Sequence, residues 1–146
     1  MYSDRIAKRA WLPLGAALVF AISAGPYLSI AAAADIKVTL TGDQEVPPVK
    51  SAGTGSGTIV IGTDKTVSGS VKSTGIAGTA AHIHEAASGT NGPVIIPLTK
   101  DGDTYAVPAG AKLTDAQFAS FQAGNLYVNV HTAANPGGEI RGQLKP

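Results

Sequence analysis

The sequence contains no cysteine, so it can form no disulfide and supply no thiolate to a metal. A cysteine-linked lipid anchor is excluded for the same reason. The fold must therefore depend on packing alone, and any strong metal ligand must be a histidine or a carboxylate. The sequence also lacks a phosphate-binding loop, a serine-histidine-acid order and the paired acidic motif of many hydrolases. We therefore assign no catalytic residues.

The N-terminal 34 residues have the pattern of a secretory signal peptide. A start with three basic residues is followed by an uncharged stretch over 11–34, which ends in four alanines. Signal peptidase accepts such small residues, so we predict cleavage after Ala34 and a secreted or periplasmic product. The alternative is a retained membrane anchor, since twenty-four uncharged residues could span a bilayer. Interruptions at Pro13, Gly25 and Pro26 favour the cleaved signal.

The remaining segment, 35–146, has the length of one domain. It carries eight of the eleven basic residues and nine of the ten acidic ones, which gives a net charge of −1. Nucleic-acid binding requires clustered lysine and arginine, so this charge argues against a nucleic-acid partner. No amphipathic helix for a membrane follows the signal. We expect the partner to be another protein or an extracellular ligand.

Short alternating segments separated by glycine and proline predict an all-β domain. Ile36, Val38 and Leu40 alternate with polar residues, and the segments 58–61 and 66–71 flank a turn typical of a hairpin. Two prolines exclude 44–49 from a central strand and indicate an extended loop or a sheet edge, which could also present a rigid surface to a partner. We predict a Greek-key β-sandwich or flattened barrel of about 7–8 antiparallel strands.

One short helix is expected over 114–123. Thr114 is a suitable N-cap with Gln117 three residues later, and Gly124 follows in the position that often ends a helix. Phe118 and Phe121 lie three positions apart on this segment. We expect these two rings to hold the helix against the sheet.

The only three histidines fall on two predicted strands. His82 and His84 flank Ile83, so both imidazoles project from the face opposite Ile83. In the segment 126–131 the alternate residues beginning at Leu126 form an apolar stripe, which leaves His131 on the other face. If the two strands are neighbours, the outer surface of the sheet carries a three-nitrogen metal site.

Neutral imidazole binds copper, zinc and nickel, and two histidines separated by one residue on a strand present two nitrogens side by side. We expect copper to bind more tightly than zinc at His82, His84 and His131, following the general affinity order. The alternative is that these histidines form hydrogen bonds with neighbouring strands or remain solvated. Redox catalysis would further require an open coordination position, so we expect binding rather than turnover.

The C-terminal segment alternates in the same way. Ile140 and Leu144 are expected in the core, whereas Glu139 and Arg141 share the outer face. The turn at 135–138 would bring this strand beside the strand of His131. Arg141 could then guide an anion to the metal, with Glu139 beside it as a supporting group. The alternative is that both charges form salt bridges on the sheet surface.

Four ordered motifs resemble the CHRD domain, a module named for its repeats in chordin that also occurs alone in exported bacterial proteins. The resemblance runs from about Ile36 to Leu144 and implies a β-sheet domain that works as a binding or structural module. The motifs are 40–42 together with 45–49, then 81–84, 126–132 and 135–144.

A second, more distant resemblance concerns the histidine strands. The segment 82–85 is similar to the strand of copper/zinc superoxide dismutases that supplies two copper ligands, and His131 resembles a further ligand there. Arg141 is similar to the arginine that guides superoxide. No histidine remains to bridge copper to zinc and no cysteine can form the structural disulfide, so a zinc-linked site is excluded. A copper-dependent, superoxide dismutase-like oxidoreductase is thus the alternative function.

Overall fold

A computed structural model describes residues 33–146. The predicted signal peptide lies outside the described residues except for its last two positions, and strand β1 begins at Ala34, immediately before the predicted mature N-terminus. No helix within 33–146 has the length and apolar character needed to cross a membrane.

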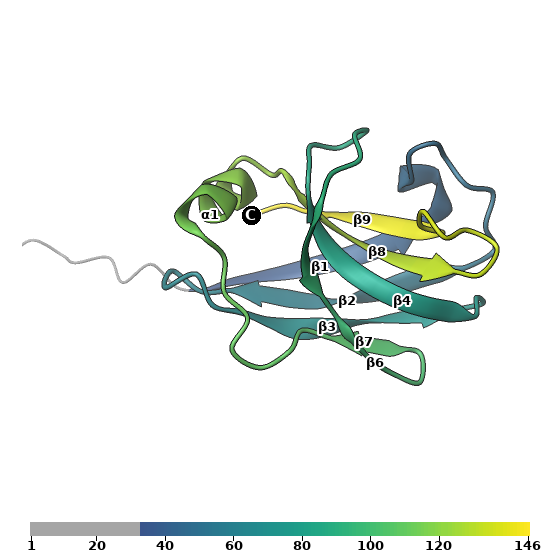
Figure 1. The fold of residues 1–146 in the computed structure, drawn as a ribbon, viewed down its shortest axis with the longest axis horizontal. Helices are drawn as coiled ribbons and strands as arrows, with labels where there is room; N and C mark the ends of the chain where they lie inside the picture. The colour runs from purple at the N-terminus through teal and green to yellow at the C-terminus, as the bar shows by residue number, and fades with distance from the viewer. Residues whose placement is uncertain (1–32) are drawn as a thin grey trace, which may run out of the picture. The chain divides into compact units, whose positions relative to one another are not determined.

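The described residues form one nine-stranded antiparallel sheet in the order β5-β4-β8-β9-β1-β2-β3-β7-β6 (Figure 1). The N–H of Leu98 donates to the carbonyl of Ala81 over 3.0 Å, which draws the β6 end of the chain against β4. The sheet is therefore a nearly closed, flattened barrel, as predicted. Its elements are β1 Ala34–Thr41, the 3-10 turn η1 Gly42–Gln44, β2 Thr54–Ile61, β3 Val67–Thr74, β4 Gly78–Glu85, β5 Val94–Pro97, β6 Thr99–Asp101, β7 Thr104–Ala106, α1 Asp115–Gln122, β8 Leu126–Thr132 and β9 Ile140–Leu144.

The described chain has nine strands rather than seven or eight because a short hairpin follows β5. Strands β6 and β7 are three residues each and turn at Gly102, whose φ of 58° lies in the left-handed region that glycine adopts easily. The predicted hairpin of β2 and β3 is confirmed, with all eight residues of each strand paired.

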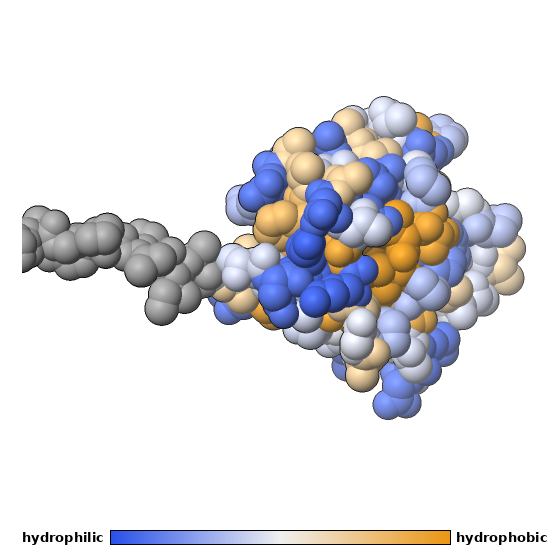
Figure 2. All heavy atoms as spheres, turned by 60° about the vertical axis from the view of Figure 1, so that its left-hand side comes forward, coloured by the Kyte–Doolittle hydropathy of each residue, from blue (hydrophilic) through white to orange (hydrophobic). Residues whose placement is uncertain are grey.

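The core lies inside the curved sheet and is built from the alternate positions that the sequence indicated. Leu126, Val128 and Val130 on β8 are fully buried, and so are Ile140 and Leu144 on β9. The face drawn in Figure 2 is mostly hydrophilic and carries an apolar patch. Val94 is the one large hydrophobic side chain in the described region that is largely exposed, at 48%.

Helix α1 forms at the predicted segment. Thr114 accepts a hydrogen bond from the N–H of Gln117, and the Gln117 side chain accepts one in return from the N–H of Thr114. This reciprocal pair satisfies two N–H groups that the first helical turn leaves free. Phe121 is buried in the core, whereas Phe118 is only partly buried. Phe118 nevertheless packs against the core, so both rings hold the helix as predicted, with Phe121 the more deeply buried of the two.

The face of the sheet opposite the core differs from the expectation of an open outer surface. Tyr127, Asn129 and Arg141 all project from this face, yet each is at most 2% exposed. Segments 43–53, 86–93 and 133–139 connect the neighbouring strands, and several of their backbone carbonyls bind this face. The sequence correctly predicted which side chains share this face but not that loops bury it.

Candidate metal centre

The three histidines converge at one point of the sheet. Strands β4 and β8 are antiparallel neighbours, with His82 opposite Asn129 and Ala80 opposite His131. One ring nitrogen from each of His82, His84 and His131 lies within 4.8 Å of the other two. The alternation in the sequence thus predicted the correct convergence, and the strands are neighbours as that interpretation required.

His84 is held with one nitrogen free for a ligand. Its Nδ1 lies 3.0 Å from the carbonyl oxygen of Gly92, an acceptor, so Nδ1 carries the proton. The other nitrogen, Nε2, is buried and finds no hydrogen-bond partner among the described residues. A buried polar atom without a partner loses its hydration without compensation, so this lone pair is suited to a metal ion.

His131 is fixed in the same tautomer. Its Nδ1 lies 2.9 Å from the carbonyl oxygen of Pro136, which again assigns the proton to Nδ1 and the lone pair to Nε2. That Nε2 is 2.9 Å from Nδ1 of His82, so without a metal His82 donates this hydrogen bond. Backbone carbonyls that orient metal-binding imidazoles in this way are a common feature of metal sites.

The spacing of His82 and His131 also fits two ligands of one ion. Two metal–nitrogen bonds of about 2.0–2.1 Å at a right angle place their nitrogens about 2.9 Å apart, which is the distance between Nδ1 of His82 and Nε2 of His131. The histidines therefore suit a metal ion at His82 Nδ1, His84 Nε2 and His131 Nε2.

The ring of Tyr127 stacks on the imidazole of His84 and helps to fix its orientation. The ring of Tyr127 lies parallel to the imidazole of His84, with the ring centres 4.7 Å apart and the planes inclined by 4°. The guanidinium carbon of Arg141 lies 3.4 Å from the centre of the Tyr127 ring. Gly92 links both rings, since its N–H donates to the Tyr127 hydroxyl over 3.2 Å and its carbonyl accepts from His84.

Burial favours the neutral form of two of the imidazoles. The pKa values of His82 and His84 are lowered, mainly because burial disfavours the charged ring. The neighbouring histidines lower both values further, whereas the hydrogen bond from His84 to Gly92 acts in the opposite direction. Since only neutral imidazole binds a metal, this shift extends the pH range over which the ligands are available.

Arg141 is placed near the histidines but is almost fully buried. It lies opposite Asn129 in the pairing of β8 with β9, and its guanidinium donates to the carbonyl of Ala87 over 3.2 Å. It makes weaker contacts of 3.4 Å with Asn91 and Gln143. The interpretation of Arg141 as part of a surface salt bridge is wrong, because it forms no ion pair with any described residue.

Glu139 shares no hydrogen bond with Arg141 in the described structure and forms its own network. Its carboxylate accepts hydrogen bonds from the hydroxyl of Ser51 at 2.7 Å, the hydroxyl of Thr132 at 2.5 Å and the amide of Asn135 at 3.1 Å. These donors, led by Thr132, lower the pKa of Glu139 and keep it ionised. Glu139 thus ties the β1–β2 loop to the turn after β8 and forms no described salt bridge.

Two buried polar residues beside this site were missed by sequence reasoning. Glu45 is 5% exposed and Asn129 is 1% exposed, and each has one buried oxygen without a hydrogen-bond partner in the described structure. Burial raises the pKa of Glu45, and the charge of Arg141 together with the amides of Asn129 and Val46 offsets only part of this effect. The alternation of β8 placed Asn129 on the histidine face, but no local pattern could show that Glu45 folds back over that face.

Comparison with known proteins identifies the family. The family model of the CHRD domain matches residues 36–144, which is most of the chain and agrees with the span of the four motifs. Searches of curated proteins and of solved structures give no significant match. The chain belongs to the CHRD domain family.

Proposed function

We propose that this protein is an exported CHRD binding module that holds a copper ion through His82, His84 and His131. The observation that carries the proposal is the convergence of three imidazoles within 4.8 Å, one of them with a buried nitrogen that has no partner in the described structure. CHRD membership supports a binding or structural role, and the uncharged N-terminal stretch supports export.

Copper is favoured by the donor set. All three ligands are imidazoles, and the affinity of such a site for divalent ions rises to copper and falls again at zinc. The 2.9 Å spacing of the His82 and His131 nitrogens suits ligands at a right angle, an arrangement typical of Cu(II). When bound, copper could supply Lewis-acid or one-electron chemistry at this face.

Metal titration of the mature domain, 35–146, tests this proposal. We expect one Cu(II) ion per chain, with tighter binding than Zn(II) in competition. The variant His82→Ala, His84→Ala and His131→Ala should lose this binding while keeping the β-sheet spectrum. Equal copper affinity in the parent and in this folded triple variant would rule out the site.

A second candidate is a copper-dependent oxidoreductase with superoxide dismutase-like chemistry. It is favoured by the partial exposure of His82 and His131, which leaves one side of the cluster accessible to a small molecule. The assay is superoxide consumption by the copper-loaded domain. A rate above that of free copper, lost in His84→Ala, would support the oxidoreductase, whereas copper binding without such a rate would leave the binding module.

A further inference from the structure

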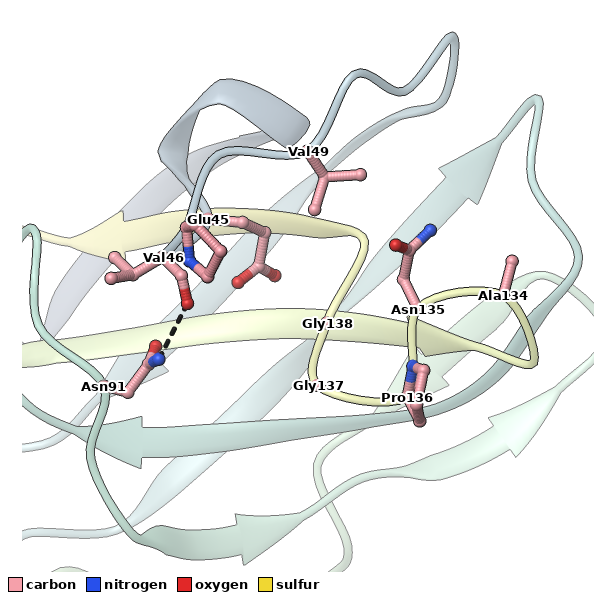
Figure 3. A pocket seen from close by; sticks show the side chains of 10 residues that line it. Glu45, Val46, Val49, Asn91, Ala134, Asn135, Pro136, Gly137 and Gly138 are labelled. Atoms are coloured by element: carbon pink, nitrogen blue, oxygen red, sulfur yellow. Dashed lines mark hydrogen bonds between the residues drawn. The ribbon is translucent and has the colours of Figure 1, made fainter.

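A pocket of about 240 Å³ lies beside the metal centre, between the loop after η1 and the turn after β8 (Figure 3). None of the three histidines lines it. The volume is below the range of about 300–1,000 Å³ that holds drug-sized ligands, so the pocket suits a molecule of a few heavy atoms. It therefore forms a site distinct from the metal centre.

The pocket contains a buried carboxylate. Glu45 points its carboxyl group into the space between the two loops (Figure 3), although the side chain is only 5% exposed. Its Oε1 is buried and has no hydrogen-bond partner within 33–146. Arg141 is close enough to affect Glu45 electrostatically, but it makes no ion pair with it and is directed to the Tyr127 ring and the carbonyl of Ala87. The amides of Asn129 and Val46 also lower the pKa of Glu45, but Oε1 itself has no hydrogen-bond partner in the described structure and retains capacity for a donor.

Hydrogen bonds hold the loops that surround the pocket. The Asn91 side chain donates to the carbonyl of Val46 over 2.7 Å, and the N–H of Val49 donates to the carbonyl of Gly42 over 2.8 Å. Gly138 has a φ of 131°, and a Cβ there would lie 2.4 Å from Oε1 of Glu45. The turn can therefore approach the carboxylate only because this position is glycine.

We propose that this pocket binds a small organic cation, with a primary ammonium group at Glu45 and a short alkyl stem against the loop walls. An ammonium group offers three donors, and Oε1 of Glu45 has no donor in the described structure. The side chains of Val46, Val49 and Pro136 supply apolar contacts for the stem. No aromatic residue lines the pocket, which disfavours quaternary ammonium ions, and one carboxylate is too few for a divalent metal.

The proposal is tested by NMR titration of the metal-free mature domain with n-propylammonium chloride at constant ionic strength. Saturating shifts are expected at the backbone amides of Asn91, Gly137 and Gly138. Neutral n-propanol has the same stem without the charge, and tetramethylammonium has the charge without the donors. Both should bind at least about tenfold more weakly, because a charge-assisted hydrogen bond is lost.

Two substitutions locate the binding. Glu45→Gln should weaken n-propylammonium at least about tenfold. The matched control Asp43→Asn removes an exposed carboxylate from the same segment and should leave the affinity within about twofold. If Glu45→Gln does not fold, Ala134→Trp replaces an exposed residue at the pocket and should also weaken binding by filling it.

Three results would overturn the proposal. The first is the absence of saturating shifts with n-propylammonium in the folded parent. The second is equal binding of n-propanol. The third is unchanged n-propylammonium affinity in Glu45→Gln or, if that variant is unfolded, in Ala134→Trp. The experiment uses no metal, so its outcome is independent of the copper proposal.

Discussion

The two faces of strands β4 and β8 are buried in different ways and have opposite chemistry, and on the outer face His82 and His131 remain partly exposed. On the inner face Ala81, Ile83, Val128 and Val130 are apolar and at most 1% exposed. On the other face His84, Tyr127 and Asn129 are polar and at most 7% exposed. One face is buried by packing inside the sheet, and the other by loops that cross it.

The loop-covered face also carries buried polar atoms that lack a hydrogen-bond partner, and these lower the stability of the fold. Five buried side-chain atoms in the described region have no hydrogen-bond partner, and those of Glu45, His84 and Asn129 belong to the loop-covered side. Each such atom costs about 1–3 kcal/mol. Native structures contain few buried polar atoms without a partner. Three of them beside one cluster of histidines therefore indicate a ligand-binding site. The inner face should therefore determine stability and the loop-covered face should determine binding.

The largest expected effect is on the inner face. Ile83→Ala should destabilise the domain by about 2–5 kcal/mol, because Ile83 is 1% exposed and the lost side chain leaves a cavity. Copper affinity of the folded variant should stay within about threefold of the parent. Urea unfolding and copper titration of the same sample measure both quantities. A large loss of copper affinity in folded Ile83→Ala would show that the two faces are not separable.

The next largest effect is expected at His84, which follows Ile83 in β4 and lies on the other face. Here copper affinity should change strongly and stability only a little. His84→Ala should lower copper affinity more than about 100-fold, since even removal of a supporting residue costs 10–100-fold. Metal-free stability should fall less than in Ile83→Ala, because the lost hydrogen bond to Gly92 and the lost stacking on Tyr127 are partly offset by removal of the unpartnered Nε2. Competition with a chelator and urea unfolding provide the two values. Loss of stability equal to that of Ile83→Ala would contradict the comparison.

A smaller effect concerns pH. The folded-state pKa values of His82 and His84 are lowered from an ordinary value of about 6.5, so the unfolded chain takes up protons first as the pH falls. Their contribution to metal-free stability is present above about 6.5 and is lost as the pH falls from there towards the folded values. Copper should accordingly remain bound below about pH 6.5.

Urea midpoints at pH 7.5 and 5.5 measure this contribution as a difference between the parent and the double variant His82→Ala and His84→Ala. Comparison with the variant removes the contribution of other titrating groups, including Glu45. The parent should lose more stability than the variant over this interval. Identical losses would show that these histidines are not shifted.

The smallest effect is expected at Glu85, which alternates onto the face opposite the histidines. Its carboxylate accepts a hydrogen bond from the hydroxyl of Ser120 on α1 over 2.6 Å. Glu85→Gln should cost about 0.5–1.5 kcal/mol of stability and leave copper binding unchanged. Thermal unfolding and copper titration check this, and a change in copper affinity would place Glu85 in the site.

The sequence could predict features that depend on alternation along one strand. The shared face of His82 and His84, and the apolar stripe beginning at Leu126, follow from the two-residue period of a strand. The capping pattern at Thr114 is likewise local, and it fixed the start of α1 correctly. The resemblance to the CHRD domain gave the family, which the family model confirms.

Features that depend on loops could not be predicted from the alternation along a strand. The local sequence predicts that Glu45 and Arg141 are exposed, because both are charged. Segments distant in sequence fold over them and bury both side chains. Strands β6 and β7 were missed because three-residue strands with polar residues carry too little alternation to detect. The ligand nitrogen of each histidine depends on carbonyls of Gly92 and Pro136, and no sequence spacing specifies them.

The most direct measurement is histidine side-chain nitrogen NMR of the mature domain during addition of Zn(II), a diamagnetic stand-in for copper. The account predicts metal-induced shifts at His82 Nδ1, His84 Nε2 and His131 Nε2, while the protons on Nδ1 of His84 and His131 remain on their carbonyl acceptors. Unchanged ring nitrogens at saturating zinc, or coordination through Nδ1 of His84, would contradict it.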